Sequence, residues 1–424
     1  MTHNAWVPGA LGMVLLAISM PSPAATQGAD TGLLQGATVD LTGLNYYYNR
    51  DFRSGVGQGK REEWAQGFIL DARSGWTPGP IGFGVDLMGL ADVKLDGVSS
   101  EEGTGILPTD ANGARNELTR LGITGKARAG ESVLRIGTLI PNEPIIKAST
   151  SRMLPQTFQG GILESKDIPG LDVYVARYTS SWYRDGVGNQ PLTLTNKNRR
   201  FSGTPDSDHF DMLSAQYQLG KQLVLRYQTG ELDQIYRQQV LNLTHKIGLG
   251  AGVLRTEVRY FKTDDVDQAR AGRIDSTMLN ALVGYTLGGH ELSAGLQNLS
   301  GRTAMPWLGG TDGNVFNWTF INDFLENRQH SWQARYALDG DKLGLKGWKF
   351  MARYIHADHA DPATVSYEGR EWERDFQLDY QFQSEGLKHF SVRWINGTFR
   401  SNFQRDADEN RIILQYKVAL YDPD

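Results

Sequence analysis

The chain has 424 residues, 49 glycines, no cysteine and a net charge of −5. The lack of cysteine excludes disulfides, thiolate metal sites and cysteine nucleophiles, and the small net charge argues against nucleic-acid binding. After residue 25 no apolar run reaches the roughly 18–20 residues that a membrane helix needs. Two classes remain: a large soluble periplasmic protein, or a membrane β-barrel whose apolar residues alternate with polar ones.

The first 24 residues are predicted to be an export signal. An apolar run covers 11–20, and Ser22, Pro23, Ala24 and Ala25 offer small residues for cleavage. The run is too short to span a bilayer. The start is unusual because His3 is its only possible cation. We expect a signal peptide over 1–24 and a single domain over 25–424.

The segment 151–161 is expected to be an ordered, non-regular insertion. Its residues, Ser-Arg-Met-Leu-Pro-Gln-Thr-Phe-Gln-Gly-Gly, are too polar for a sheet core and too poor in charge for a solvated linker. It follows 141–146, where Pro141 and Pro144 exclude a central strand. An insertion of this kind usually narrows or gates a passage.

Three later segments alternate apolar and polar residues with a period of two. Each contains a turn: Gly220-Lys221 in 213–227, Gly288-Gly289 in 281–296, and Ser384-Glu385-Gly386 in 376–394. The pattern predicts β-hairpins with one apolar and one polar face. Short turns alternate with long polar connections such as 301–329, which is typical of outer-membrane barrels and not of soluble sandwiches.

The length predicts 16 to 18 strands, because about 400 residues at about 22 per strand and connection give roughly 18. A barrel of that size is too wide for side chains alone to fill, so it encloses a pore. Aromatic residues near strand ends on the apolar face match an interfacial girdle: Trp332, Tyr336, Trp348, Tyr354, Trp394 and Tyr416. The predicted fold is all-β, a transmembrane antiparallel barrel.

Arginines occupy many positions between the apolar residues of these strands. An arginine on the lipid face at mid-membrane costs about 2–4 kcal/mol, so these side chains are expected to face the lumen. One such arginine usually neutralises a carboxylate of the barrel wall. Several together form an electropositive track, in which each planar guanidinium group can bind a carboxylate and then pass it to the next arginine. The candidates are Arg135, Arg255, Arg259, Arg335, Arg353, Arg393 and Arg411.

No catalytic, metal or cofactor site is expected. The nearest metal candidate is the group His356, Asp358, His359 and Asp361, which we interpret as a solvated polar loop. Neither a Gly-x-Ser-x-Gly elbow nor a His-Glu-x-x-His motif occurs, so the sequence favours a channel over an enzyme.

Several blocks, in order, resemble the OprD family of outer-membrane channels over essentially the whole mature chain. These blocks are 45–52 (Asn-Tyr-Tyr-Tyr-Asn-Arg-Asp-Phe), 61–68 (Arg-Glu-Glu-Trp-Ala-Gln-Gly-Phe), 82–86, 94–96, 151–157, 233–238 and 331–336. The resemblance implies an 18-stranded barrel, monomeric or loosely trimeric, with inward-folded constriction loops, that takes up small carboxylates in a bacterial outer membrane.

The resemblance also implies a basic ladder and an eyelet. The matching ladder positions are Arg50, Arg61, Arg152, Arg393, Arg400 and Arg411. The eyelet positions are Asp323, Ile321, Trp318, Pro155 and Gln156, with Asp323 expected to receive an ammonium or hydroxyl group of the substrate.

The chain departs from the family pattern at four positions. Ile321 and Trp318 replace a tyrosine and a serine of the eyelet, Ile395 occupies a ladder position, and Asp379 replaces a lysine. These changes favour a carboxylate with an apolar or aromatic body.

The alternatives are a non-selective general porin, a barrel enzyme and a soluble binder. The expected partners are outer-membrane lipid and lipopolysaccharide, small anionic carboxylates and the barrel-assembly machinery, which would read the chain end near Tyr421. Nucleic acid is not an expected partner.

Overall fold

A closed antiparallel barrel of 18 strands dominates the computed structural model, which describes residues 32–423. The ring closes where β1 pairs with β22, so the sheet has no free edge. The barrel strands are β1 (Thr38–Phe52), β2 (Lys60–Arg73), β3 (Ile81–Asp96), β6 (Glu117–Ala129), β7 (Ser132–Leu139), β10 (Thr157–Ile168), β11 (Leu171–Trp182), β12 (Phe210–Leu219), β13 (Leu223–Leu232), β14 (Tyr236–Leu249), β15 (Gly252–Asp265), β16 (Asp275–Leu287), β17 (His290–Gly301), β18 (His330–Asp339), β19 (Trp348–Ala360), β20 (Gly369–Gln381), β21 (Phe390–Ser401) and β22 (Ala407–Tyr421). The predicted strand number is confirmed.

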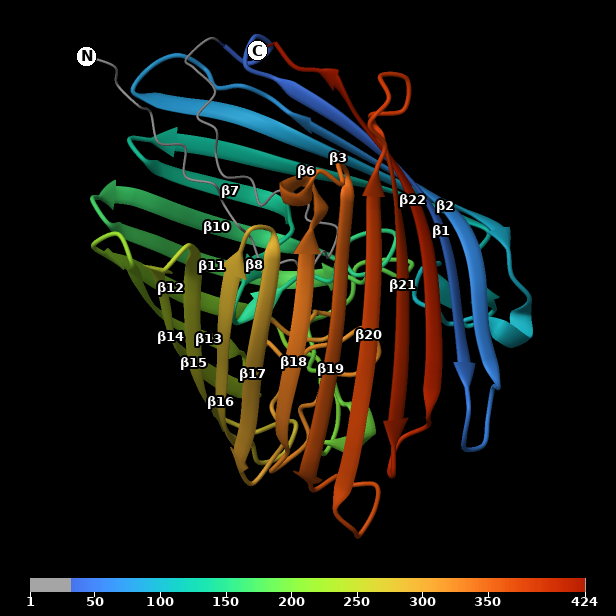
Figure 1. Cartoon of the computed structure of the whole chain (residues 1–424). Coiled ribbons are helices and arrows are strands. Elements are labelled where there is room, and N and C mark those ends of the chain that lie inside the picture. The colour runs from blue at the N-terminus through green and yellow to red at the C-terminus, as the bar shows by residue number, and fades with distance from the viewer. Residues whose placement is uncertain (1–31, 424) are drawn as a thin grey trace.

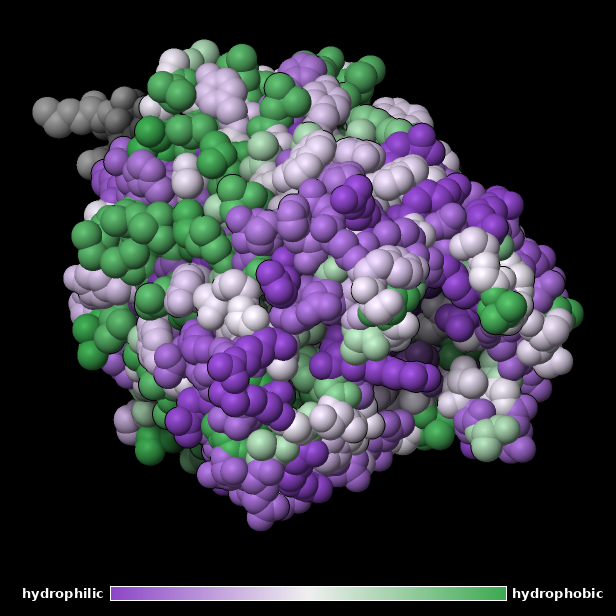
Figure 2. All heavy atoms as spheres, turned by 90° about the horizontal axis from the view of Figure 1, so that it is seen from below, coloured by the Kyte–Doolittle hydropathy of each residue, from purple (hydrophilic) through white to green (hydrophobic). Residues whose placement is uncertain are grey.

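Short turns join the strands at one end of the barrel and longer connections at the other. The end with short turns also holds the starting residues of β1 and the last residues of β22 (Figure 1). The opposite end, drawn face-on in Figure 2, is dominated by hydrophilic side chains, with hydrophobic ones gathered toward one edge. The predicted signal peptide, 1–24, lies outside the described residues.

Alternation along each strand separates an outer apolar face from a lumenal face. In β22, Ile412 and Leu414 are 48% and 40% exposed, whereas Arg411 and Ile413 are buried inside the barrel. This two-residue period is the one that the sequence shows, because successive side chains of a strand point to opposite faces. Within 32–423 no helix combines the length and apolarity needed to cross a bilayer.

Outward aromatic residues form bands near both ends of the barrel wall. Trp332 packs on Tyr354 with ring centroids 5.7 Å apart near the long connections, and Trp348 packs on Tyr380 at 4.5 Å near the short turns. Such bands are found where a barrel wall meets the two membrane interfaces.

The longest connections fold into the barrel and pack against its inner wall (Figure 1). They carry the small hairpins β4 (Thr109–Asp110) with β5 (Gly113–Ala114) and β8 (Asn142–Glu143) with β9 (Ile146–Lys147), and the 3-10 turns η1 (Ser99–Glu101) and η2 (Lys197–Arg199). The turn η3 (Gly340–Leu343) lies at the other end. Two apolar groups of loop and wall residues hold these connections in place.

One apolar group of loop and wall residues lies against β1, β2 and β22. Met153 and Leu154 of the connection between β9 and β10 pack there beside Ile106 and Leu107 of the connection between β3 and β6. The prediction of an irregular insertion over 151–161 is wrong for its second half, because Thr157 begins β10. Polar wall residues are compatible with a barrel strand whose inner face borders a wet lumen.

Candidate functional site

Three guanidinium groups surround the ring of Tyr48 on the lumenal wall. The Cζ atoms of Arg152, Arg411 and Arg50 lie 5.1, 5.4 and 5.8 Å from the ring centroid. Tyr48 and Arg50 share the inner face of β1, and the register brings Arg411 of β22 directly opposite Tyr48. Arg152 reaches the same ring from the inward connection between β9 and β10. Cation–π attraction therefore holds like charges close together around one aromatic face.

Glu409 is the carboxylate that neutralises part of this charge. It accepts hydrogen bonds from Arg50 Nε at 2.7 Å, from Arg411 Nε at 2.5 Å and from the Tyr48 hydroxyl at 2.5 Å. The carboxylate is completely buried beneath the arginines. One acid thus serves two arginines, and the group retains a positive excess.

Arg61 and Arg152 supply that excess. No carboxylate oxygen of residues 32–423 lies within 4.0 Å of either guanidinium group, and their hydrogen bonds go to carbonyl and amide oxygens instead. Arg61 is paired in register with Arg50 across β1 and β2. Burial, with the nearby Arg411 cation adding to the effect, lowers the pKa of Arg152 to about 10, which still leaves it protonated at neutral pH.

Backbone carbonyls of three inward connections hold these arginines in place. Arg152 Nε donates to Thr104 O at 3.1 Å, and Arg411 donates to Ser151 O at 3.3 Å and to Phe320 O at 2.7 Å. The Phe320 ring lies between Arg411 and Arg353, at 5.6 and 5.7 Å. Wall and loops therefore meet in one region, which we call the constriction, where arginines of the wall and of a loop lie beside an aromatic ring.

Arg393 continues the series toward the end of the barrel that carries the short turns. It is paired with Ile413 in the register of β21 and β22. This pair lies two residues along the strands from the pair of Ile395 with Arg411, on the same inner face. The Arg393 guanidinium pairs with Asp379. In register, Arg50 and Arg61 therefore share one level of this wall, and Arg411 and Arg393 follow at the next two levels.

Arg400 is not part of this wall, which corrects the sequence-based prediction. On β21 the inner face carries Ile395 and Phe399, both buried, so Arg400 belongs to the alternate, outer face. Its guanidinium pairs with Asp408 at 2.7 Å and lies 6.0 Å from the Trp372 ring. The physical reason is the two-residue period of the strand, which separates positions 399 and 400 onto opposite faces.

Asp323 does not face the passage either, which corrects its predicted role as a receptor for ammonium groups. It accepts two hydrogen bonds from Arg200, at 2.8 and 2.7 Å, and lies 3.5 Å from Lys197. Arg200 also donates to Glu326. These charges hold the pKa of Asp323 well below its usual range, so the carboxylate is already neutralised inside the protein. It ties the connection after β11 to the connection before β18.

The remaining eyelet residues are divided between the constriction and its supports. Ile321 packs against Gly397 and the buried Phe399, and its amide donates to Glu373 at 2.8 Å. Trp318 contributes a carbonyl that accepts from Arg353 at 3.0 Å. Pro155 is buried and Gln156 is completely buried, donating to Ser181 and Gly309, so both anchor the base of the loop.

Sequence reasoning missed Tyr48, Glu409 and Phe320 as parts of the site. The first two could have been found, because Tyr48 precedes Arg50 by two residues and Glu409 precedes Arg411 by two, so each pair shares one strand face. Phe320 lies in a non-regular connection, where periodicity carries no information about direction.

The interpretation of 356–361 as a solvated loop is wrong for most of the segment, because β19 extends to Ala360. Asp358 and His359 lie at the end of that strand, and His330 of β18 is their neighbour.

Comparison with known proteins agrees with the fold. Residues 31–420 match the family model described as outer membrane porin, OprD family. The porin-like protein GalP of Pseudomonas putida is 33% identical over 413 residues, 96% of each chain. The crystal structure of Pseudomonas aeruginosa OccK9 (OpdG) superposes with a TM-score of 0.88 at 38% identity, over 92% of this chain and 100% of that one.

A structure of Pseudomonas aeruginosa OpdK with vanillate superposes with a TM-score of 0.85 at 35% identity, again over 92% of this chain and 100% of that one. These relatives are porins, which are channels and not enzymes. The chain therefore belongs to the OprD family of outer-membrane porins and is an 18-stranded outer-membrane channel of a Gram-negative bacterium.

Proposed function

We propose that this porin is a selective channel for small carboxylates that carry an apolar or aromatic body. The observation that carries the proposal is the excess of arginine over carboxylate at the constriction. Arg50, Arg61, Arg152 and Arg411 lie together there, and Glu409 is the acid that pairs with two of them. A carboxylate can bind Arg61 or Arg152 without first displacing a protein carboxylate.

The ladder would also let the anion leave. Conduction requires sites strong enough to attract a solute and weak enough to release it. Arg393 lies one step beyond Arg411 but is paired with Asp379, so the attraction weakens toward the end with the short turns. A carboxylate would therefore move from arginines that have no carboxylate partner to an arginine that is paired with an aspartate as it crosses the barrel.

The walls of the constriction favour an apolar body. The rings of Tyr48 and Phe320 and the side chain of Ile395 adjoin the arginines. Asp323 is already bound by Arg200, so it offers no partner for an ammonium group. Vanillate, present in the related OpdK structure, is an aromatic carboxylate and so has the chemistry that this arrangement would accept.

Uptake by liposomes containing the purified mature protein tests the proposal. We expect a labelled benzoate-type anion to enter faster than an amino acid or a neutral sugar of similar size. Arg61→Ala combined with Arg152→Ala should slow entry of the anion about tenfold or more, on the scale of one lost charged hydrogen bond of about 1.5–3 kcal/mol, and leave sugar entry unchanged. These two arginines are chosen because no buried carboxylate is left unpaired when they are removed.

Arg400→Ala is the matched control, since that arginine lies on the same strand as Arg393 but on the outer face. It should leave uptake of every solute unchanged. Equal rates for all solutes in the unmodified protein would instead favour a general porin. Unchanged anion uptake in the double variant would refute the ladder.

A further inference from the structure

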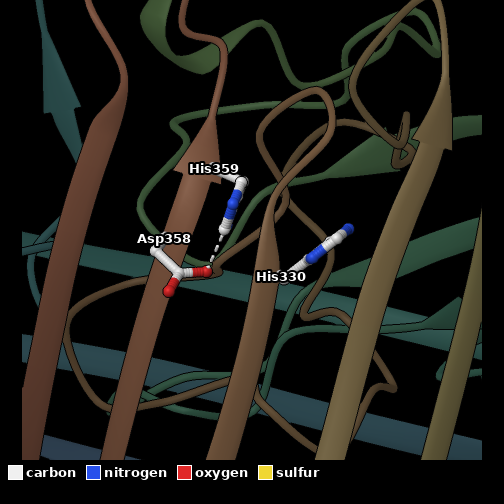
Figure 3. Close-up of side chains that lie close together, drawn as sticks. All are labelled: His330, Asp358 and His359. Atoms are coloured by element: carbon white, nitrogen blue, oxygen red, sulfur yellow. Dashed lines mark hydrogen bonds and ion pairs between the residues drawn. The ribbon is translucent and has the colours of Figure 1, made fainter.

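A group of two histidines and an aspartate lies on the outer face of the barrel, away from the constriction. His330 begins β18, and Asp358 and His359 lie near the end of β19 (Figure 3). His330 and Asp358 are opposite each other in the register of these strands. On β18 the neighbouring Ser331 is buried inward, so His330 points outward.

A β-bulge brings the third side chain to the same face. The register of β19 with β20 shifts between Ala357 and Ala360, both of which are buried inside. Without the extra residue, the strict alternation that places Ala357 inward would also turn His359 inward. His359 instead has a left-handed backbone, φ 56°, and an exposed side chain. Bulges are known to redirect side chains in this way, and a non-glycine residue in this conformation is uncommon.

The three side chains are close enough to bind one ion. One ligand atom from each lies within 4.8 Å of the other two. His359 Nδ1 lies 2.7 Å from Asp358 Oδ1, and the ring centroids of His330 and His359 are 5.2 Å apart. Tetrahedral zinc with bonds of about 2.0–2.1 Å needs ligand atoms about 3.4 Å apart. Small rotations of exposed side chains cover the difference.

We propose that His330, Asp358 and His359 bind one divalent transition-metal ion on the outer face of the barrel. Imidazole nitrogen favours zinc, copper or nickel over magnesium and calcium, which prefer oxygen ligands. Three protein ligands leave at least one coordination position open to the exterior. The site is separate from the proposed carboxylate path, because its ligands lie on the opposite face of the strand wall.

The aromatic band fixes the depth of this site. Trp332 of β18 faces His356 of β19. This pair lies two residues farther along the strands than the pair of His330 with Asp358, on the same outer face, and its ring centroids are 6.2 Å apart. Trp332 belongs to the interfacial band near the long connections. The metal would therefore lie just beyond the apolar zone, where ions from the medium can reach it.

Zinc binding by the tag-free, detergent-purified mature protein tests the proposal. After removal of metals with a chelator, titration calorimetry should show one equivalent of Zn²⁺ bound. His330→Ala, Asp358→Asn and His359→Ala should each weaken that binding about tenfold or more. With Cu²⁺, electron paramagnetic resonance should show two coupled imidazole nitrogens in the unmodified protein and one in each histidine variant.

His209→Ala is the control, because His209 is a histidine beside an aspartate, 3.6 Å from Asp211, elsewhere on the molecule. It should retain full zinc binding. A change in gel mobility between unheated and heated samples checks that each variant still forms a folded barrel. The proposal would be overturned if the unmodified protein bound no stoichiometric Zn²⁺. It would also be overturned if all three variants bound Zn²⁺ as tightly as the unmodified protein, or if His209→Ala weakened Zn²⁺ binding as much as they do.

Discussion

Arg200 and Asp323 show how one ion pair changes the chemistry of a passage. The two side chains come from different inward connections and are both buried, and Glu326 adds a second carboxylate to the same guanidinium. A free acid opposite an arginine ladder would attract the ammonium group of an amino acid. The paired acid instead stabilises the contact between loops, because a buried charge is tolerated only when it is neutralised.

Asp323→Asn should therefore affect loop stability and not transport. Because the folded-state pKa of Asp323 is depressed, its ion pair stabilises the protein above the unfolded pKa of about 3.9, and this contribution is lost as pH falls through the lower folded pKa. At pH 7 the variant should lose about 1–3 kcal/mol of local stability, with Glu326 still holding Arg200. Limited proteolysis of the connection between β11 and β12 measures this loss.

Uptake of the benzoate-type anion should stay within about twofold of the unmodified protein in the same variant. A large change in the preference between this anion and an amino acid would show that Asp323 does contact the solute. The difference in cleavage rate between variant and unmodified protein should shrink below about pH 4, because Asp323 then becomes protonated in the opened loop while it is still charged in the folded one, and the ion pair contributes less stability.

The position of the inward loop depends on a glycine in the wall of β2. A Cβ atom at Gly67 would lie 2.6 Å from Cγ and 3.0 Å from Sδ of Met153, which is completely buried. Met153 follows Arg152 in the chain, so the space at Gly67 helps to set how far this arginine reaches toward Tyr48. The packing of the loop against β2 thus helps to set the position of the Arg152 guanidinium group.

Gly67→Val should displace the loop at a cost of about 1–3 kcal/mol and reduce anion uptake several-fold, as expected for overpacking. Gly43→Val is the control on the neighbouring strand β1, because the nearest atoms to its added Cβ would lie at 3.9 Å. Uptake in liposomes compares the two variants. Reduced uptake in both, or in neither, would contradict the role assigned to the Gly67 contact.

Strand periodicity explains which parts of the site could be predicted. Alternation placed Arg393 and Arg411 correctly inside the barrel, and the same period, applied to β21 from Ile395 onward, also assigns Arg400 to the outside. The pairing of Asp323 with Arg200 could not be predicted, because the two residues are 123 positions apart in the sequence and each lies in a non-regular connection. The position of His330 next to His359 likewise depends on strand register, which alternation does not determine.

The charges of the whole channel are unevenly distributed around the lumen. On β15, Arg255 and Arg259 share Glu257, and on β19 Arg353 is paired with Asp375. By contrast, Arg61 and Arg152 have no carboxylate within ion-pair distance among the described residues. The net charge of −5 over the whole sequence therefore says nothing about the sign of the field at the constriction.

This local excess predicts anion selectivity that depends on salt concentration. In a planar bilayer under a KCl gradient, the reversal potential of the unmodified channel should favour Cl⁻ over K⁺ at about 0.1 M salt. The preference should weaken toward 1 M, where the screening length falls from about 10 Å to about 3 Å. The combined Arg61→Ala and Arg152→Ala variant should shift the reversal potential toward K⁺ at low salt, while Arg400→Ala should not. A cation-selective unmodified channel would mean that the lumenal carboxylates, and not the arginines at the constriction, govern what passes.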